Sequence, residues 1–284
     1  MDEVKILYHY LQACNLNQPT MVDVGSHSGG ALYKFAKANW IVYGFEPNPH
    51  MRKKSQKNLA NWKIEKNVTI FDFALSNSNE DEVDFFLSNE STGISSLIPF
   101  HKSHESRFKV KMRTFESWEK ENPINKIDFL KIDVEGNDMK VLQGFNWDKF
   151  DPTAVIVEYE DNKTKLLNIQ MKDLFRFLKE KGYSIIISEW HPIEKYGIDH
   201  KWKQFILEDS TTTYNPNGWG NLIAVKNLNL ELFANAIQNA SLDDIQRLKK
   251  NAHDHEVALN KLRESTPSAF RDLYRAVKKR FKSP

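Results

Sequence analysis

Three acidic residues in the middle of the chain have the types and the spacing needed for acid–base chemistry. Asp133 and Glu135 follow the apolar run Ile127–Ile132, and Glu158 follows the next apolar run, Ala154–Val157. Because alternate residues of a strand share a face, Asp133 and Glu135 are expected to point the same way. If the two strands are neighbours, all three carboxylates converge, and their mutual repulsion raises one pKa toward that of a general base.

Other interpretations of these acids stay open. They could be solvated strand ends, or they could hold a hard cation, which oxygen ligands favour. The chain has no Cys/His spacing typical of zinc. We predict that no metal is bound and that Asp133 is the first candidate for the base, with His101 or His191 on long loops as substitutes.

A second chemical signal lies near the N-terminus, where a predicted strand ends in a glycine-bearing turn. The run VDVGSHSGG contains Gly25, which lets the backbone pass close to a ligand, and Gly29, which permits close packing of the following helix. Roughly twenty residues later, Glu46 ends the next predicted strand, where its carboxylate can accept hydrogen bonds from both ribose hydroxyls. Together these features predict a nucleoside-containing cofactor at the edge of a sheet.

The spacing in this turn favours one cofactor over another. A dinucleotide usually needs G-x-G-x-x-G, whereas this turn reads D-x-G-x-x-x-G and begins with Asp23. An acid repels a pyrophosphate but favours a ligand that carries an ammonium and a sulfonium. We therefore predict S-adenosylmethionine, with a nicotinamide-dependent oxidoreductase as the less favoured alternative.

The elements that position these residues alternate along the first 226 residues. Short apolar runs and amphipathic stretches follow one another, which predicts a doubly wound α/β fold with a mostly parallel, seven-stranded sheet. The predicted strands are Met21–Val24, Trp40–Phe45, Val68–Leu75, Ile127–Ile132, Ala154–Val157, Tyr183–Ile187 and Asn221–Val225. The predicted helices are Gly30–Ala38, His50–Asn61, Asp138–Leu142 and Lys172–Lys181.

Long loops between these elements are candidates for covering a substrate. Asp81–Leu87 and Phe108–Met112 alternate like exposed strands around the polar loop Ser88–His104. The segment Trp190–Gly220 is rich in aromatic and turn residues, which could stack on the apolar face of a sugar ring or simply pack the loop onto the sheet. Its aromatic residues include Trp190, Trp202, Tyr214 and Trp219.

Composition narrows the class of protein. The 284 residues include 40% hydrophobic residues, enough for a sizeable core, and a net charge of +2 gives no reason to expect a nucleic-acid binder. Cys14 is the single cysteine, so no internal disulfide can form. No stretch has the apolar length of a signal peptide or a membrane span. We expect a protein of the cytoplasm, with possible peripheral contact at the inner face of the membrane.

The composition shifts after Lys226, and we predict two units, 1–226 and 227–284. Lys and Arg outnumber Asp and Glu in the second unit, a basic helical extension in which Ser241 and Asp244 resemble a capping box. A predicted terminal helix in 266–284 has one aromatic and apolar face among basic residues. That face suits an anionic membrane surface, packing on its own domain, or a homo-oligomer.

Five runs together resemble one known family. VDVGSHSGG, GFEPNP, FDFALSN, DFLKIDVEG and VIVEYE are similar to the FkbM-type S-adenosylmethionine-dependent methyltransferases, over approximately Pro19 to Val225. KIDVEG in this register is the most specific of them. The resemblance implies a Rossmann-like class I methyltransferase fold and methyl transfer to oxygen, on sugars of glycans or nucleotide-sugars or on hydroxylated natural products.

The resemblance also implies roles for individual residues. Cofactor contacts are implied for Asp23, Gly25, Ser26, His27 and Gly29, for Glu46 and Pro47 at the ribose, for Asp72 and Phe73 at the adenine, and for Asp133. Asp133 and Glu135 would face the reacting centre, and Ser91–Ser96 would correspond to a Ser-rich loop near it. His27 departs from the family pattern, in which Asn is frequent. A non-catalytic binding protein and a nucleic-acid methyltransferase are the remaining alternatives, and the latter lacks its base-holding motif.

Overall fold

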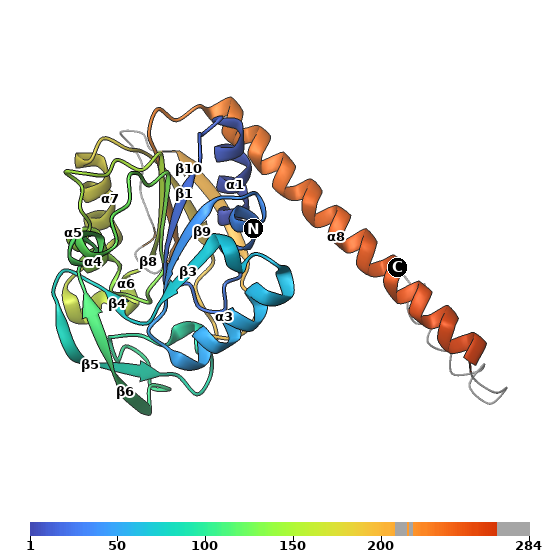
Figure 1. Ribbon diagram of the computed structural model, residues 1–284, viewed down its shortest axis with the longest axis horizontal. Coiled ribbons are helices and arrows are strands. Elements are labelled where there is room, and N and C mark those ends of the chain that lie inside the picture. The colour runs from blue at the N-terminus through green and yellow to red at the C-terminus, as the bar shows by residue number, and fades with distance from the viewer. Residues whose placement is uncertain (208–214, 216–217, 266–284) are drawn as a thin grey trace.

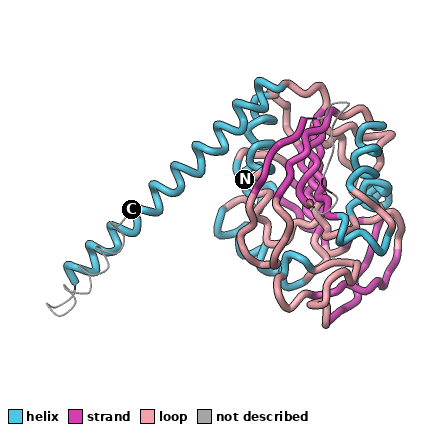
Figure 2. The backbone as a smooth tube through the Cα atoms, turned by 180° about the vertical axis from the view of Figure 1, so that it is seen from behind, coloured by secondary structure: helices cyan, strands magenta, loops and turns pink. Residues whose placement is uncertain are grey.

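The computed structural model describes residues 1–207, 215 and 218–265. Tyr214 and the predicted terminal helix in 266–284 lie outside the described residues. A central sheet of eight strands in the order β10-β9-β11-β8-β7-β1-β2-β3 forms the body (Figures 1 and 2). Its strands are β1 (Thr20–Val24), β2 (Ile41–Phe45), β3 (Val68–Phe71), β7 (Phe129–Ile132), β8 (Ala154–Glu160), β9 (Ser184–Trp190), β10 (Trp202–Leu207) and β11 (Trp219–Val225).

The predicted doubly wound, mostly parallel sheet is confirmed. Strands β3, β2, β1, β7 and β8 are parallel neighbours. Beyond β8, each strand is antiparallel to the one before it: β11 to β8, β9 to β11 and β10 to β9. The strand order reverses between β1 and β7, because β2 lies on the other side of β1. Ligands of open α/β sheets bind at such a switch point, outside the carboxyl ends of the strands.

The predicted number of seven strands is wrong, because β10 adds an eighth at the edge. Lys203 and Gln204 are exposed and interrupt this strand, so it lacks the continuous apolar run of a strand covered on both faces. The predicted strand Val68–Leu75 is also split. Its first half is β3, whereas β4 (Ala74–Leu75) belongs to a second sheet.

Alternate residues of each central strand divide the core between the two faces of the sheet. Met21, Phe129 and Ile156 pack under α1 (Glu3–Ala13), α2 (Tyr33–Lys37), α3 (Pro49–Trp62) and the start of α8 (Leu230–Ser265). Val22, Leu130 and Val155 pack under α4 (Phe115–Glu121), α5 (Asp138–Gly144) and α7 (Met171–Glu180). Helices therefore cover both faces, as the nearly continuous apolar strands require (Figure 2).

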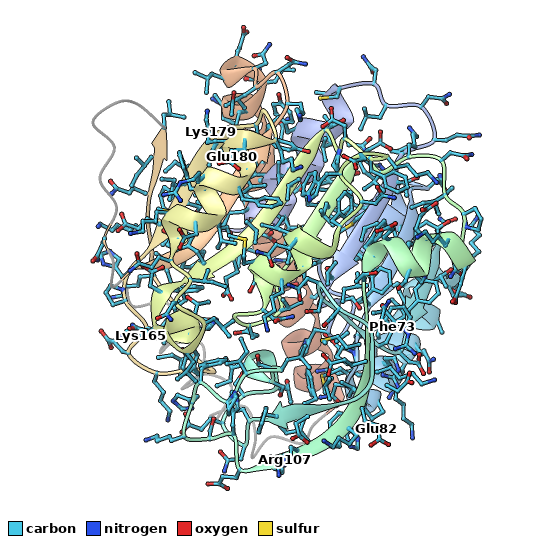
Figure 3. All side chains as sticks on the ribbon, turned by 90° about the vertical axis from the view of Figure 1, so that its left-hand side faces the viewer. Phe73, Glu82, Arg107, Lys165, Lys179 and Glu180 are labelled. Carbon is cyan, nitrogen blue, oxygen red and sulfur yellow. The ribbon has the colours of Figure 1, made fainter. Side chains whose placement is uncertain are left out.

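A smaller sheet lies beyond the carboxyl edge of the central one. It has the order β4-β6-β5, with β5 (Glu80–Leu87) antiparallel to β6 (Ser106–Arg113). Figure 3 shows its strands, marked by Glu82 and Arg107, at the lower end of the body. The alternating pattern of the sequence predicted both exposed strands correctly.

The long helix α8 leaves the body after its first turns and projects outward (Figure 1). Phe233, Ala236 and Ala240 are buried in the core, whereas Leu242 and Leu248 are exposed. The predicted capping box at Ser241 is wrong, because the helix continues through this residue and its hydroxyl donates to the Ile237 carbonyl. Among the described helices, none has the length and apolar character needed to span a membrane.

Candidate functional site

A cavity lies at the switch point, where the ends of β1, β2 and β7 meet the loop that follows β5. We call it the first cavity. Its walls come from both sheets and from the polar loop that was predicted to cover a substrate. The lining residues are Val24, Gly25, His27, Phe45, Glu46, Pro47, Asn48, Met51, Ala74, Leu75, Phe85, Thr92, Gly93, Ser95, Leu97, Asp133, Val134 and Glu135.

Gly25 makes the close approach of β1 to β7 possible. Its φ of +81° lies in the left-handed region, and a Cβ placed there would stand 1.9 Å from the carbonyl oxygen of Asp133. The backbone N–H groups of Gly25 and Ser26 both donate to the Phe45 carbonyl. Gly25 is therefore required by the neighbouring strand end, which the sequence motif alone did not reveal.

Glu46 is held by the backbone. One carboxylate oxygen accepts from the N–H of His27 at 2.8 Å and the other from the N–H of Asn48 at 2.8 Å. Burial raises the pKa of Glu46 to about 7, against the lowering effect of these two hydrogen bonds. A carboxylate oxygen has more than one lone pair, so Glu46 can still accept hydrogen bonds from a ligand in the cavity.

Asp23 lies behind the cavity wall and is fully buried. The Nζ atom of Lys131 is 3.1 Å from its carboxylate and 3.4 Å from that of Asp133. Burial raises the pKa of Asp23, and the Lys131 charge opposes that rise. Asp23 does not line the first cavity, and the acids that do are Glu46, Asp133 and Glu135.

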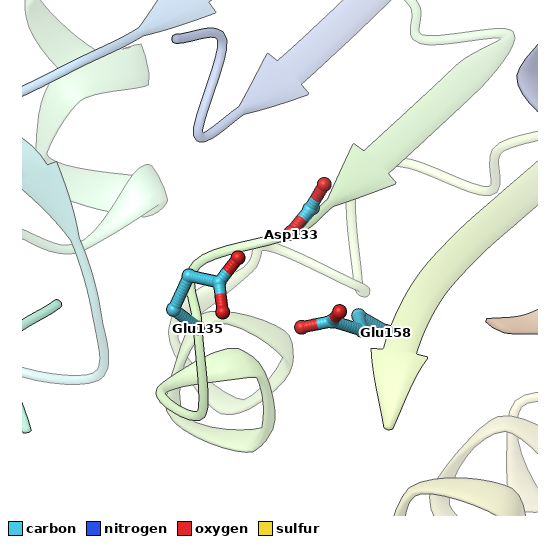
Figure 4. A group of neighbouring side chains, drawn as sticks. All are labelled: Asp133, Glu135 and Glu158. Carbon is cyan, nitrogen blue, oxygen red and sulfur yellow. The ribbon is translucent and has the colours of Figure 1, made fainter. Parts of the chain in front are cut away.

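Asp133, Glu135 and Glu158 converge, as the sequence predicted. Figure 4 shows the three carboxyl groups turned toward one another, with one oxygen of each within 4.8 Å of the others. The two strands are neighbours as predicted, but the predicted strand face was wrong, because β7 ends at Ile132 and Asp133 and Glu135 lie on the turn that follows. Glu135 has a left-handed φ of +59°, which is unusual for a residue with a Cβ.

Asp138 shapes that turn. Its carboxylate accepts from the N–H of Val134 at 3.2 Å and from that of Gly136 at 2.9 Å. These two bonds fold the chain back after β7 and bring Glu135 opposite Glu158, which comes from β8. Strain of this kind persists only where surrounding contacts hold it, and it is common at functional sites.

Lys163 is the main member of the site that sequence reasoning missed. Its Nζ atom lies 2.5 Å from Glu135, 2.9 Å from Glu158 and 3.2 Å from Glu160. The side chain is 3% exposed and comes from the short helix α6 (Asp161–Thr164). In the sequence it is one of many lysines, and only the pairing of β7 with β8 brings it to the acids. We call Asp133, Glu135, Glu158, Glu160 and Lys163 the acid–lysine cluster.

Burial dominates the electrostatics of this cluster. It raises the pKa of Glu135 to about 7, with Lys163 opposing the rise. The pKa of Glu158 is also well above its usual value, because of burial and of the neighbouring Glu135 charge. Burial alone would lower the pKa of Lys163, but the three glutamates raise it well above its usual value. The lysine thus stays charged, while a glutamate beside it can exchange a proton near neutral pH.

The remaining predicted cofactor residues fall in three places. His27 and Pro47 line the first cavity, and the His27 ring is 3.0 Å from the Thr92 hydroxyl. Ser26 is buried beneath the turn, and Gly29 packs against Ser55 of α3.

Asp72 and Phe73 do not line the first cavity. Phe73 packs on Phe45 and Phe71, behind the wall of that cavity. The structure therefore brings Phe73 close to the cavity without exposing it there.

Two further cavities adjoin the cluster. The second cavity, of about 820 Å³, lies between α1, α2, α8 and the end of β7, and Asp133 lines it as well as the first. The third cavity, of about 530 Å³, lies beyond Lys163, among the loops at the carboxyl end of β8. His101 lines this third cavity, whereas His191 does not.

Comparison with known proteins gives one family match. Residues 23–185 match the model of the family described as the methyltransferase FkbM domain. No curated protein matches the chain.

Several solved structures are similar at low sequence identity. One is the methyltransferase FkbM from Methylobacillus flagellatus KT, at 15% identity and a TM-score of 0.42, with 77% of this chain and 47% of that chain covered. A second is a putative O-methyltransferase from Klebsiella pneumoniae, at 12% identity and a TM-score of 0.43, with 80% and 81% covered. A third is the magnesium protoporphyrin IX methyltransferase from Synechocystis PCC 6803 with bound SAM, at 14% identity and a TM-score of 0.40, with 79% and 78% covered.

Proposed function

Since this chain belongs to the FkbM methyltransferase family, we propose that it transfers the methyl group of S-adenosylmethionine to a hydroxyl oxygen of a sugar, in a glycan or a nucleotide-sugar. The observation that carries the proposal is that Glu46 and Glu135 line the same cavity at the switch point of the sheet. Glu46 is suited to bind a ribose and Glu135 is suited to accept a proton, so a single cavity has both groups that the reaction needs.

The residues of the first cavity fit S-adenosylmethionine. Three acids, Glu46, Asp133 and Glu135, line the cavity, and its lining within the described residues includes neither Lys nor Arg. Burial lowers the pKa of His27, so this ring stays neutral near pH 7. A negative lining favours a ligand with an ammonium and a sulfonium and disfavours a pyrophosphate. Glu46 would hold the ribose, and Pro47 and Met51 would pack on the apolar parts of the nucleoside.

Bound S-adenosylmethionine supplies a methyl group on a positively charged sulfur, which is a good leaving group. The protein then has to align the acceptor and take up its proton. We assign the role of general base to Glu135. A base works best when its pKa lies near the working pH, and burial raises the pKa of Glu135 to about 7. The sequence placed Asp133 first, but this side chain is 42% exposed, whereas that of Glu135 is 13% exposed.

The proposed reaction needs no reactant besides S-adenosylmethionine and the acceptor. The acceptor oxygen forms a bond to the methyl carbon, the carbon–sulfur bond breaks, and the hydroxyl proton passes to Glu135. Lys163 holds the Glu135 carboxylate at 2.5 Å and fixes its direction while the proton moves. The protonated glutamate then loses its proton to water. Lys163 stays charged throughout and acts as a positioning residue.

Methyl transfer from labelled S-adenosylmethionine to a panel of monosaccharides, oligosaccharides and nucleotide-sugars tests the proposal. The alternative acceptor is a hydroxylated natural product, and a phenol and a polyhydroxylated macrocycle in the same panel test it. We expect label in a saccharide, with a rate that rises with pH through about 7 as Glu135 ionises. Label in the phenol or the macrocycle alone would contradict the sugar assignment, and label in no compound would contradict the methyl-transfer proposal.

A further inference from the structure

The third cavity has a composition suited to a sugar. It is formed by three segments that come together at the carboxyl end of β8: Phe100–Lys102, Glu160–Lys163 and Pro192–Tyr196, with Trp219 at its rim. Its volume of about 530 Å³ falls in the range of small-molecule sites. Of the three cavities, this one has the most aromatic residues in its lining: Phe100, His101, Tyr196 and Trp219.

Aromatic rings form part of the wall and are fixed in place. The rings of His101 and Tyr196 meet edge to face, with centroids 5.1 Å apart. Trp219 stacks obliquely on Trp190 at 5.4 Å, and its ring nitrogen donates to the His191 carbonyl at 2.8 Å. Rings held in this way present a ready apolar surface to the CH face of a sugar at low entropic cost.

Polar groups alternate with these rings. The Tyr196 hydroxyl donates to Glu160 at 2.9 Å, and Asn162, Glu90 and Lys102 also line the cavity. Sugar hydroxyls both donate and accept hydrogen bonds, so a wall with carboxylates, an amide and ammonium groups can satisfy them in several directions.

One loop separates the third cavity from the first. In the predicted cover loop Ser88–His104, the residues Thr92–Leu97 face the first cavity, and Phe100–Lys102 face the third. Beneath this loop, Lys163 lines the third cavity while its Nζ atom contacts Glu135, which lines the first. The acid–lysine cluster is thus the common floor of the two cavities.

We propose that the third cavity binds the sugar acceptor, with a ring of the saccharide on Trp219 and Tyr196 and its reacting end toward the acid–lysine cluster. This inference rests on the proposed function, since it places the acceptor of that reaction. It also explains why Tyr196 and Trp219 line the same cavity as Phe100–Lys102 of the polar loop Ser88–His104.

The second cavity is the rival location, and its lining is less suitable. Four of its five cations are already paired: Lys5 and Arg247 with Asp244, Lys34 with Asp243, and Lys131 with Asp23. Of its two aromatic residues, Phe35 is fully buried, which leaves Tyr33 as the one partly exposed ring among the lining residues. This lining therefore offers a sugar one partly exposed aromatic ring and few unpaired charges.

The test uses methyl glycosides of glucose, galactose, mannose and rhamnose as probes, with binding to the full chain followed by saturation-transfer NMR. We expect at least one glycoside to bind and Trp219→Ala to weaken it about fivefold to tenfold, the loss of one aromatic stacking surface. Tyr196→Ala should act in the same direction. Trp202→Ala is the matched control, because Trp202 lies on β10, outside the lining of this cavity.

Three results would overturn the assignment. Binding that survives both Trp219→Ala and Tyr196→Ala would place the sugar elsewhere, and binding lost in Tyr33→Ala would place it in the second cavity. Absence of binding by all four glycosides at millimolar concentration would remove the sugar from this cavity.

Two controls make these results interpretable. If Trp219→Ala does not fold, Trp219→Tyr keeps a ring and should retain most of the binding. Calorimetry with S-adenosylhomocysteine is scored separately. If that compound binds and the glycoside results contradict the assignment, only the placement of the acceptor in the third cavity is wrong. If it does not bind to folded protein, the proposed function falls.

Discussion

Two parts of the site hold a buried carboxylate by different means. At the turn after β1, Glu46 is fixed by two backbone N–H groups, those of His27 and Asn48. In the acid–lysine cluster, Glu135 shares one side-chain cation, Lys163, with Glu158 and Glu160. Both glutamates have a pKa of about 7, and in both burial is the main cause.

The difference shows how each region responds to change. Backbone donors cannot be removed by a side-chain substitution, so the turn depends on its conformation and therefore on Gly25. The cluster depends on one ammonium group, so a single substitution would alter three acids at once. We expect the turn to be sensitive to backbone strain and the cluster to be sensitive to charge.

Removing the proposed base should give the largest effect and tests whether the cluster is catalytic at all. Glu135→Gln keeps the shape of the side chain but cannot accept a proton, so kcat should fall roughly 100-fold to 10,000-fold. The rise of the rate through pH 7 should disappear. Steady-state kinetics over pH 5.5–9 would measure both.

Binding of S-adenosylhomocysteine is the control for Glu135→Gln and should change little. If the variant kept its turnover and its pH dependence, Glu135 would not be the base, and Asp133→Asn should then be tested in its place.

Removing the shared cation should destabilise the protein strongly. Lys163→Met leaves three buried carboxylates without their partner, a change that typically costs about 3–5 kcal/mol of unfolding free energy. The pKa values of the acids should rise further, so the variant should be least stable at high pH and recover as pH falls and the acids take up protons. Urea unfolding at pH 5.5 and pH 8 would measure this.

Lys120→Met provides the matched control, because the Lys120–Glu116 ion pair is exposed. It should unfold like the unmodified chain at both pH values. Equal stability of the Lys163 and Lys120 variants would show that the cluster does not depend on its cation.

Substitution of two glycines near the turn should have different effects, because only Gly25 has the left-handed backbone and the close contact. In Gly25→Ala the new methyl group would stand 1.9 Å from the Asp133 carbonyl at a left-handed φ, so the ends of β1 and β7 must move apart. We expect a loss of about 1–3 kcal/mol in unfolding free energy and weaker binding of S-adenosylhomocysteine. In Gly30→Ala the methyl group would meet no atom within 4 Å, so this control should behave like the unmodified chain. Identical behaviour of the two variants would remove the proposed role of Gly25.

The smallest expected effect is the pH dependence of cofactor binding. Ribose hydroxyls donate to the ionised form of Glu46, whose pKa is about 7 in the free protein. Affinity for S-adenosylhomocysteine should therefore rise several-fold between pH 6 and pH 8. Glu46→Gln should flatten this dependence in calorimetric titrations. If Glu46→Gln kept the full pH dependence, the ionisation of another group would be responsible for the change in affinity.

The sequence predicted most of the fold because nearly continuous apolar strands leave few alternatives. All seven predicted strands are present, at least in part, whereas β10 was missed because Lys203 and Gln204 interrupt its apolar residues. The convergence of Asp133, Glu135 and Glu158 was predicted, but the left-handed turn that produces it was not. Lys163 could not be found from the sequence, because its contacts arise from the pairing of β7 with β8 and from α6. The contact between Gly25 and Asp133 likewise depends on strand order, which local spacing does not contain.

Calorimetry on the unmodified chain and on Glu46→Gln tests the central claim, that an acid-lined cavity at the turn after β1 selects a cationic methyl carrier. S-adenosylmethionine and S-adenosylhomocysteine should bind at one site per chain, the variant should bind both about 10-fold to 100-fold more weakly, and NAD+ should give no heat. Binding of NAD+ by folded protein that does not bind S-adenosylmethionine would contradict the account.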